Sequence, residues 1–171
     1  MPATRILIVT TVLSAFGLTT VHADSDRLMP RDMPKAYTQE CAACHTAYPP
    51  ALLPAASWKR IMSGLDKHYG TDASLDDATV QSLSTWLQAH AGSYRRVTDA
   101  PPEDRITRSA WFVRKHRELN PSIWQHTSIK SAANCIACHT GADQGNFDDD
   151  SVRLPADLRG RKGVGLRSSD D

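Results

Sequence analysis

Apolar residues recur every three or four positions over several stretches of this chain, which is the spacing of one face of an α-helix. One stretch predicts a helix over 54–70, with Pro54 well placed as its first residue. Another predicts a helix that Ser74 or Asp76 caps and Gly92 ends. Strict alternation of apolar and polar residues, the pattern of a strand, is nearly absent. The pattern therefore predicts a mostly α-helical fold.

Shorter helices are predicted on either side of these two. One covers 34–45, another covers 105–119 and stops before Pro121, and Ser131 caps a third. The segment 92–105 lacks apolar periodicity, which is typical of a connection between two halves.

The N-terminus carries an apolar run over 6–18, preceded by Arg5 and followed by small residues at 21–23. The run is too short to cross a bilayer as a helix, and no later segment approaches about 20 apolar residues. We therefore expect a signal peptide over 1–23, cleaved near Ala23, and a periplasmic protein without membrane insertion. An uncleaved membrane tether is the alternative.

Composition limits what the remaining chain can be. Its roughly 150 residues suffice for one domain or two small ones, and we expect domains over 24–95 and 96–171. A hydrophobic content of 40% is modest, so bound groups are expected to complete the core. Once Arg5 leaves with the signal peptide, acidic and basic side chains are equal in number, which gives no reason to expect nucleic acid as a partner.

The pentapeptide C-x-x-C-H occurs twice, at 41–45 and at 135–139, and together the copies use all 4 cysteines. This spacing is typical of c-type haem, in which both thiols bind the porphyrin covalently and the histidine binds the iron. The residues predicted to attach two haems are Cys41, Cys44, Cys135 and Cys138, with His45 and His139 as the first iron ligands.

Disulfides and a zinc site are the alternatives for these cysteines. An exported protein with 4 cysteines would ordinarily be expected to form disulfides, but the histidine after each pair argues against that here. The two C-x-x-C pairs of a zinc site usually lie much closer together than Cys44 and Cys135 do.

The second ligand of the first iron is predicted to be His68. It lies on the same helical stripe as Ile61 and Leu65 and would point toward an apolar wall. His90 is the competitor, but it occupies the end of its predicted helix, where a histidine commonly caps carbonyl groups. Met62 is better explained as a core residue than as a thioether ligand.

For the second iron the same argument favours His116. The helix over 105–119 has an apolar face formed by Trp111, Phe112, Val113, His116 and Leu119. His126 is the competitor in the loop before the motif, and a polar loop offers a ligand less rigid support. Two imidazoles per iron predict low-spin centres of low potential with no vacant position. Carbonyl groups over 49–54 are expected to accept the Nδ1 proton of His45.

Longer blocks around these residues resemble one family, the bacterial periplasmic diheme cytochromes c known as DHC. They are CAACHTAYPPALLPAASW at 41–58, LDKHYG at 65–70 followed by ASLD, RITRSAWFVRKHR at 105–117 and KSAANCIACHT at 130–140. The resemblance implies two small haem-binding domains, a class I cytochrome c-like N-terminal one and an irregular C-terminal one. It also implies that His68 and His116 complete a bis-histidine ligand set.

The resemblance implies an electron carrier and not an enzyme. The family includes members that reduce a small oxygen-binding monohaem cytochrome c and are expected to draw electrons from a membrane cytochrome b, so the resemblance implies such redox proteins as partners. The alternatives are a haem enzyme or gas-binding protein with an open or displaceable sixth ligand, or the cytochrome subunit of a larger reductase.

Overall fold

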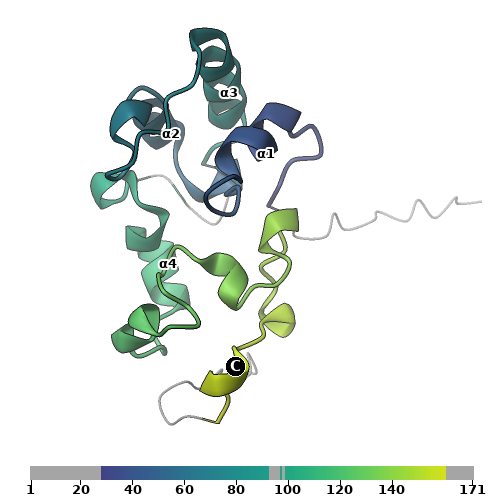
Figure 1. Ribbon diagram of the computed structural model, residues 1–171, viewed down its shortest axis with the longest axis vertical. Coiled ribbons are helices and arrows are strands. Elements are labelled where there is room, and N and C mark those ends of the chain that lie inside the picture. The colour runs from purple at the N-terminus through teal and green to yellow at the C-terminus, as the bar shows by residue number, and fades with distance from the viewer. Residues whose placement is uncertain (1–27, 93–96, 98, 161–171) are drawn as a thin grey trace, which may run out of the picture.

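The computed structural model describes residues 28–92, 97 and 99–160, and the predicted signal peptide lies outside them. Figure 1 shows an elongated molecule, with α1, α2 and α3 in one half and α4 in the other. The α-helices of the described residues are α1 (Lys35–Cys41), α2 (Ala55–Met62), α3 (Asp77–Ala89) and α4 (Ala110–Lys115). The 3-10 turns are η1 (Pro50–Leu52), η2 (Leu65–Lys67), η3 (Pro102–Asp104), η4 (Ile106–Arg108), η5 (Pro121–Gln125), η6 (Cys135–Ala137), η7 (Ala142–Gln144), η8 (Asp149–Ser151) and η9 (Ala156–Leu158).

The prediction of a mostly helical fold is confirmed, since the described residues contain no strand and only isolated antiparallel bridges. Most helices are shorter than predicted. The predicted helix over 54–70 ends at Met62 and gives way to the separate turn η2. The predicted helix over 105–119 is reduced to α4, and the second C-x-x-C-H motif lies on the turn η6.

The long helix α3 anchors the core of the first half. The Asp76 carboxylate accepts a hydrogen bond from the Thr79 backbone N–H at 3.0 Å, so this residue, not Ser74, is the cap. Leu83 and Leu87 are almost completely buried against α2 and α1. Trp58 of α2 joins this core and donates its indole N–H to the Pro50 carbonyl at 2.7 Å. Packing of the apolar helix faces therefore stabilises this half.

The second half has a smaller core, formed by Ile123, Ile129 and Leu158. Its chain is held by turns and local side-chain hydrogen bonds, such as that from the Asn134 amide to the Ile129 carbonyl at 2.9 Å. The expectation that Val113 lies on the buried face of its helix was wrong, because its side chain is 58% exposed. With only six residues, α4 buries one narrow face, which Phe112 occupies.

Several contacts outside the two cores connect the halves, among them an ion pair and a backbone hydrogen bond. The Arg60 guanidinium of α2 forms a two-pronged ion pair with the Asp104 carboxylate of η3 at 2.6 and 2.8 Å. At the start of the described chain, the Leu28 backbone N–H donates to the Gly145 carbonyl at 3.1 Å. Gly145 has a φ of 73°, and a Cβ atom there would lie 2.5 Å from the Met29 nitrogen, so only glycine fits this contact.

None of the helices in the described residues combines the length and the apolar character that crossing a bilayer requires.

Candidate haem sites

The first C-x-x-C-H motif follows α1 directly. Cys41 is the last residue of this helix, and the chain then turns so that Cys44 is exposed and His45 is half-buried. Both cysteines are free thiols, as are Cys135 and Cys138. Burial, with a smaller contribution from the Glu40 carboxylate, raises the pKa of Cys41 to about 11. Because all four thiols are free, the cysteines form no disulfide in this structure, and each thiol is available for covalent attachment of a porphyrin.

The His45 ring is fixed by its immediate neighbours. Its Nδ1 lies 2.7 Å from the Thr46 carbonyl oxygen, and its face stacks on the Tyr48 ring with centres 4.8 Å apart and planes at 16°. The expectation that a carbonyl group over 49–54 would accept the Nδ1 proton was wrong, because the carbonyl group of the next residue, Thr46, lies at hydrogen-bond distance. An Nδ1–H that donates to this carbonyl leaves Nε2 as the lone-pair atom that can bind a metal.

The structure brings His68 to this ring by a route that the sequence did not predict. His68 follows η2 and pairs with Thr71 in an isolated antiparallel bridge, so it does not lie on a continuous helix. Its ring centre is 6.2 Å from that of His45, and the planes are 24° apart. Because a metal–imidazole bond is about 2 Å long, two imidazoles on opposite sides of one metal have ring centres about 6 Å apart.

The competitor His90 has other contacts. Its Nδ1 lies 2.9 Å from the Trp86 carbonyl oxygen, and its Nε2 lies 3.3 Å from the Asp32 carboxylate. Both ring nitrogens therefore have partners at the end of α3, in the capping position predicted for it. Met62 is buried in the core of the first half, as expected for a core residue.

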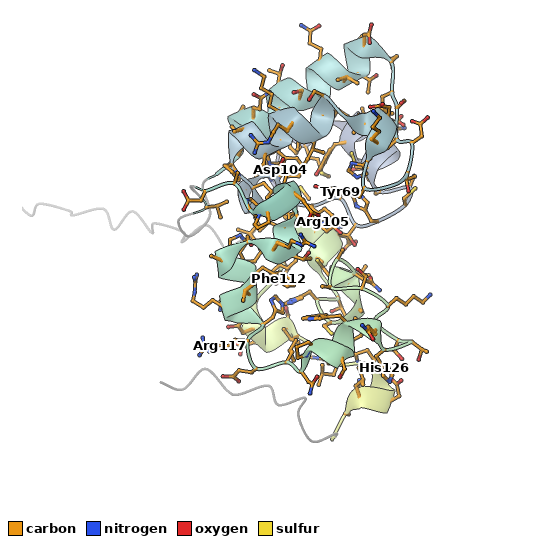
Figure 2. All side chains as sticks on the ribbon, turned by 90° about the vertical axis from the view of Figure 1, so that its left-hand side faces the viewer. Tyr69, Asp104, Arg105, Phe112, Arg117 and His126 are labelled. Carbon is orange, nitrogen blue, oxygen red and sulfur yellow. The ribbon has the colours of Figure 1, made fainter. Side chains whose placement is uncertain are left out.

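The second site pairs His139 with His116. Their ring centres are again 6.2 Å apart, but the planes are 80° apart, close to perpendicular. His116 caps the end of α4, where its Nδ1 lies 2.9 Å from the Phe112 carbonyl oxygen and its ring stacks on the Phe112 ring at 4.1 Å. Figure 2 marks Phe112 on this helix, within the lower half of the molecule.

The competitor His126 ends the turn η5, near the bottom of the view in Figure 2, and has other contacts. Its Nδ1 lies 3.4 Å from the Ser128 nitrogen and 3.6 Å from the Asp157 carboxylate. Its carbonyl group accepts hydrogen bonds from the Ile129 and Lys130 N–H groups. These contacts hold His126 in the turn that precedes the second motif.

Burial favours the neutral form of three of the paired histidines. It is the main cause that lowers the pKa of His68, His116 and His139. The partner histidine lowers the pKa of His68 and of His139 further, since two positive charges would face each other. Neutral imidazole, the form that binds metal, is therefore favoured at each of these positions.

The residues present fit two haems of c type. Each site offers two thiols, a following histidine and a second neutral imidazole at the spacing of a shared metal. The His139 Nδ1 is buried without a hydrogen-bond partner among the described protein atoms, which marks a polar site that the polypeptide alone does not complete. Sequence reasoning missed the aromatic support at the first site: Tyr48 lies three positions after His45, and Tyr69 follows His68 directly.

Two C-x-x-C-H segments, in each of which the motif histidine lies opposite a second histidine, define a c-type cytochrome with two haems. The family described as "DHC: Dihaem cytochrome c" matches residues 37–147, and the chain belongs to this family. It therefore carries two covalently attached haem c groups and is an electron-transfer haem protein. No curated protein matches the chain in sequence.

Solved structures of diheme cytochromes resemble about two thirds or more of this chain. A diheme cytochrome type c from Shewanella baltica OS155 is 36% identical, with a TM-score of 0.63 over 72% of this chain and 96% of that one. DHC purified from Rhodobacter sphaeroides is 41% identical, with a TM-score of 0.58 over 67% and 97%. A further diheme cytochrome c structure from Rhodobacter sphaeroides is 41% identical, with a TM-score of 0.60 over 68% and 98%.

Proposed function

We propose that this protein is a low-potential one-electron carrier in which two histidines hold each iron, and that it has no substrate of its own. His45 and His68 are the ligands of the first iron, and His139 and His116 those of the second. The observation that carries the proposal is the spacing of 6.2 Å between ring centres in both pairs. Haem iron supplies the change between ferric and ferrous states, and double imidazole ligation favours a low reduction potential and low spin.

The polypeptide's part in this chemistry is to hold four imidazoles in place. Thr46 and Phe112 carbonyl groups fix the orientation of one ring in each pair by contact with its Nδ1. Burial keeps the pKa of the other two rings below the ordinary value, so they do not need to lose a proton before binding iron. A rigid ligand set changes little between oxidation states, which suits a carrier.

Redox proteins are the proposed partners: a membrane cytochrome b as donor and a small oxygen-binding monohaem cytochrome c as acceptor. Function in the periplasm after removal of 1–23 belongs to the same proposal, because a c-type cytochrome family member with this N-terminal pattern is expected to be exported. Stopped-flow mixing of the reduced protein with such a monohaem cytochrome c tests the acceptor. Transfer no faster than to an unrelated cytochrome would contradict it.

The ligand set is tested with four matched variants of the haem-loaded protein. His68→Ala and His116→Ala should each convert one haem to high spin in the visible and EPR spectra of the oxidised protein. His90→Ala and His126→Ala should leave both haems low-spin, because these histidines have other partners. Low-spin spectra that survive the first two changes would overturn the assignment.

Carbon monoxide separates the carrier from its rivals. The reduced protein should not bind this gas rapidly, because both irons have two protein ligands. Rapid stoichiometric binding would instead indicate an enzyme or gas-binding protein with a displaceable ligand. A stable complex retained through native purification would indicate a subunit of a larger reductase.

A further inference from the structure

Tyr48 is held firmly between the first haem site and the core of the first half. Its ring stacks on the His45 imidazole at 4.8 Å, and its backbone carbonyl accepts a hydrogen bond from the Tyr37 hydroxyl. Tyr37 is only 2% exposed and packs on the Trp86 ring at 4.9 Å. Tyr48 itself packs against this core and is partly buried there, so the helical core helps to set the position of its ring.

The hydroxyl group of Tyr48 reaches the second half. It donates to the Ala133 carbonyl oxygen at 2.7 Å, across 85 positions of sequence. This contact lies two residues before the second haem attachment motif.

The same carbonyl oxygen also contacts the second motif itself. The Sγ atom of Cys135 lies 3.7 Å from the Ala133 oxygen. One short path therefore leads from the imidazole predicted to bind the first iron, through the Tyr48 ring and hydroxyl and the Ala133 carbonyl, to a sulfur predicted to bind the second porphyrin. It contains one ring stack, one hydrogen bond and one sulfur–oxygen contact.

We propose that Tyr48 is the positioning residue that couples the two haem sites electronically, through its ring against His45 and its hydroxyl on the Ala133 carbonyl beside Cys135. The inference rests on the proposed function and adds a route for internal electron exchange. One iron is oxidised as the other is reduced, and no proton or further reactant takes part. Tyr48 itself stays reduced and shortens the gap that an electron must cross.

A second tyrosine provides the matched control. Tyr69 stacks edge-on against His68 at 4.9 Å, and its hydroxyl donates to the Glu103 and Asp104 carbonyl oxygens at 3.2 and 3.1 Å. Figure 2 shows Tyr69, Asp104 and Arg105 together where the halves meet. Tyr69 thus joins the halves as Tyr48 does, but the segment that it reaches carries no haem attachment residue.

The test compares the haem-loaded wild type with Tyr48→Phe and Tyr69→Phe. Each protein is reduced by less than one electron per molecule in a laser flash, and the redistribution of the electron between the haems is followed optically. Tyr48→Phe keeps the ring and loses the hydroxyl, so internal equilibration should slow several-fold. Tyr69→Phe should equilibrate at the wild-type rate. Both reduction potentials and both EPR signals should stay unchanged in the two variants.

Three results would overturn the inference, and the first two concern the rate of equilibration. One is wild-type equilibration in Tyr48→Phe, and the other is equal slowing in both variants, which would assign the effect to the fit of the halves. A shift of either potential in Tyr48→Phe would also count against it, because the driving force would then have changed. If the four histidine variants behave as proposed but Tyr48→Phe does not, only the coupling route fails and the carrier function stands.

Discussion

The two haem sites use the same pentapeptide and the same spacing between imidazoles, yet their surroundings differ in kind. The first lies beside three packed α-helices and is bordered by two tyrosines. The second lies among turns and is bordered by Phe112, Trp124 and Phe147. The ring planes meet at 24° in the first and 80° in the second. The motif therefore specifies attachment, while the surrounding chain specifies how the imidazoles are oriented.

The different orientation of the imidazole rings should produce the largest measurable difference between the two haem sites. Parallel imidazoles split two iron d orbitals in energy, whereas perpendicular imidazoles leave them nearly equal. The oxidised protein should therefore show one rhombic low-spin EPR signal, from the first site, and one signal of very large g value, from the second. Tyr48→Leu, which removes the stacking partner of His45, should broaden the first signal only. Two identical signals in the wild type would contradict the contrast.

The second largest effect is expected from core packing, measured as the free energy of unfolding. Leu83 is fully buried in the larger core, so Leu83→Ala should lower the free energy of unfolding by about 3 kcal/mol, measured by denaturant titration with circular dichroism. Val113→Ala is the control, because this exposed side chain should contribute no more than about 0.5 kcal/mol. Equal losses from both variants would mean that the burial of these positions does not determine stability.

Helix caps provide a smaller test. The Ser109 hydroxyl accepts a hydrogen bond from the Phe112 N–H at 3.3 Å, and Ser109→Ala should cost about 1 kcal/mol. Because α4 has only six residues and ends at His116, this change should also broaden the EPR signal of the second site. Asp76→Ala, at the start of the longer α3, should leave both signals unchanged. Unchanged signals in both variants would contradict the dependence of His116 on α4.

The ion pair between the halves gives the smallest effect. The hydrogen bond from the Arg60 guanidinium is the main cause that lowers the pKa of Asp104 below its ordinary value of 3.8. The pair therefore stabilises the fold above that value, and the stabilisation is lost as pH falls through the lowered pKa. At neutral pH, Asp104→Asn should reduce stability by no more than about 0.5 kcal/mol. Thermal unfolding at a series of pH values should show the stability difference between wild type and variant disappear in acid. A difference that grows as the pH falls would contradict this prediction.

The first half could be predicted largely from its sequence because regular packing leaves a periodic signal. Leu83 and Leu87 marked the buried face of α3 correctly, and Asp76 was one of two named caps. His68 was chosen on a helical stripe, yet it meets His45 through a 3-10 turn and an isolated bridge. The choice of residue and the local structure assigned to it were thus separate predictions, and the second was wrong.

The second half gave no comparable signal. Its turns depend on hydrogen bonds such as that from the Asn134 amide to the Ile129 carbonyl, and such contacts follow no period. The helix predicted over 105–119 extended too far because the apolar residues that continue it, among them Leu119, pack on the separate core of Ile123 and Ile129. Tyr48 was overlooked for a related reason, since its partner Ala133 lies 85 positions away.

The contact between Leu28 and Gly145 limits how the protein can be trimmed. It ties the first described residue to a turn just beyond the second haem motif. Removal of residues up to Ala23 would leave this contact intact, whereas removal of Leu28 as well would take away a hydrogen bond that holds the turn at Gly145. The position of any cleavage relative to Leu28 would therefore decide whether the turn beyond the second haem motif keeps this hydrogen bond.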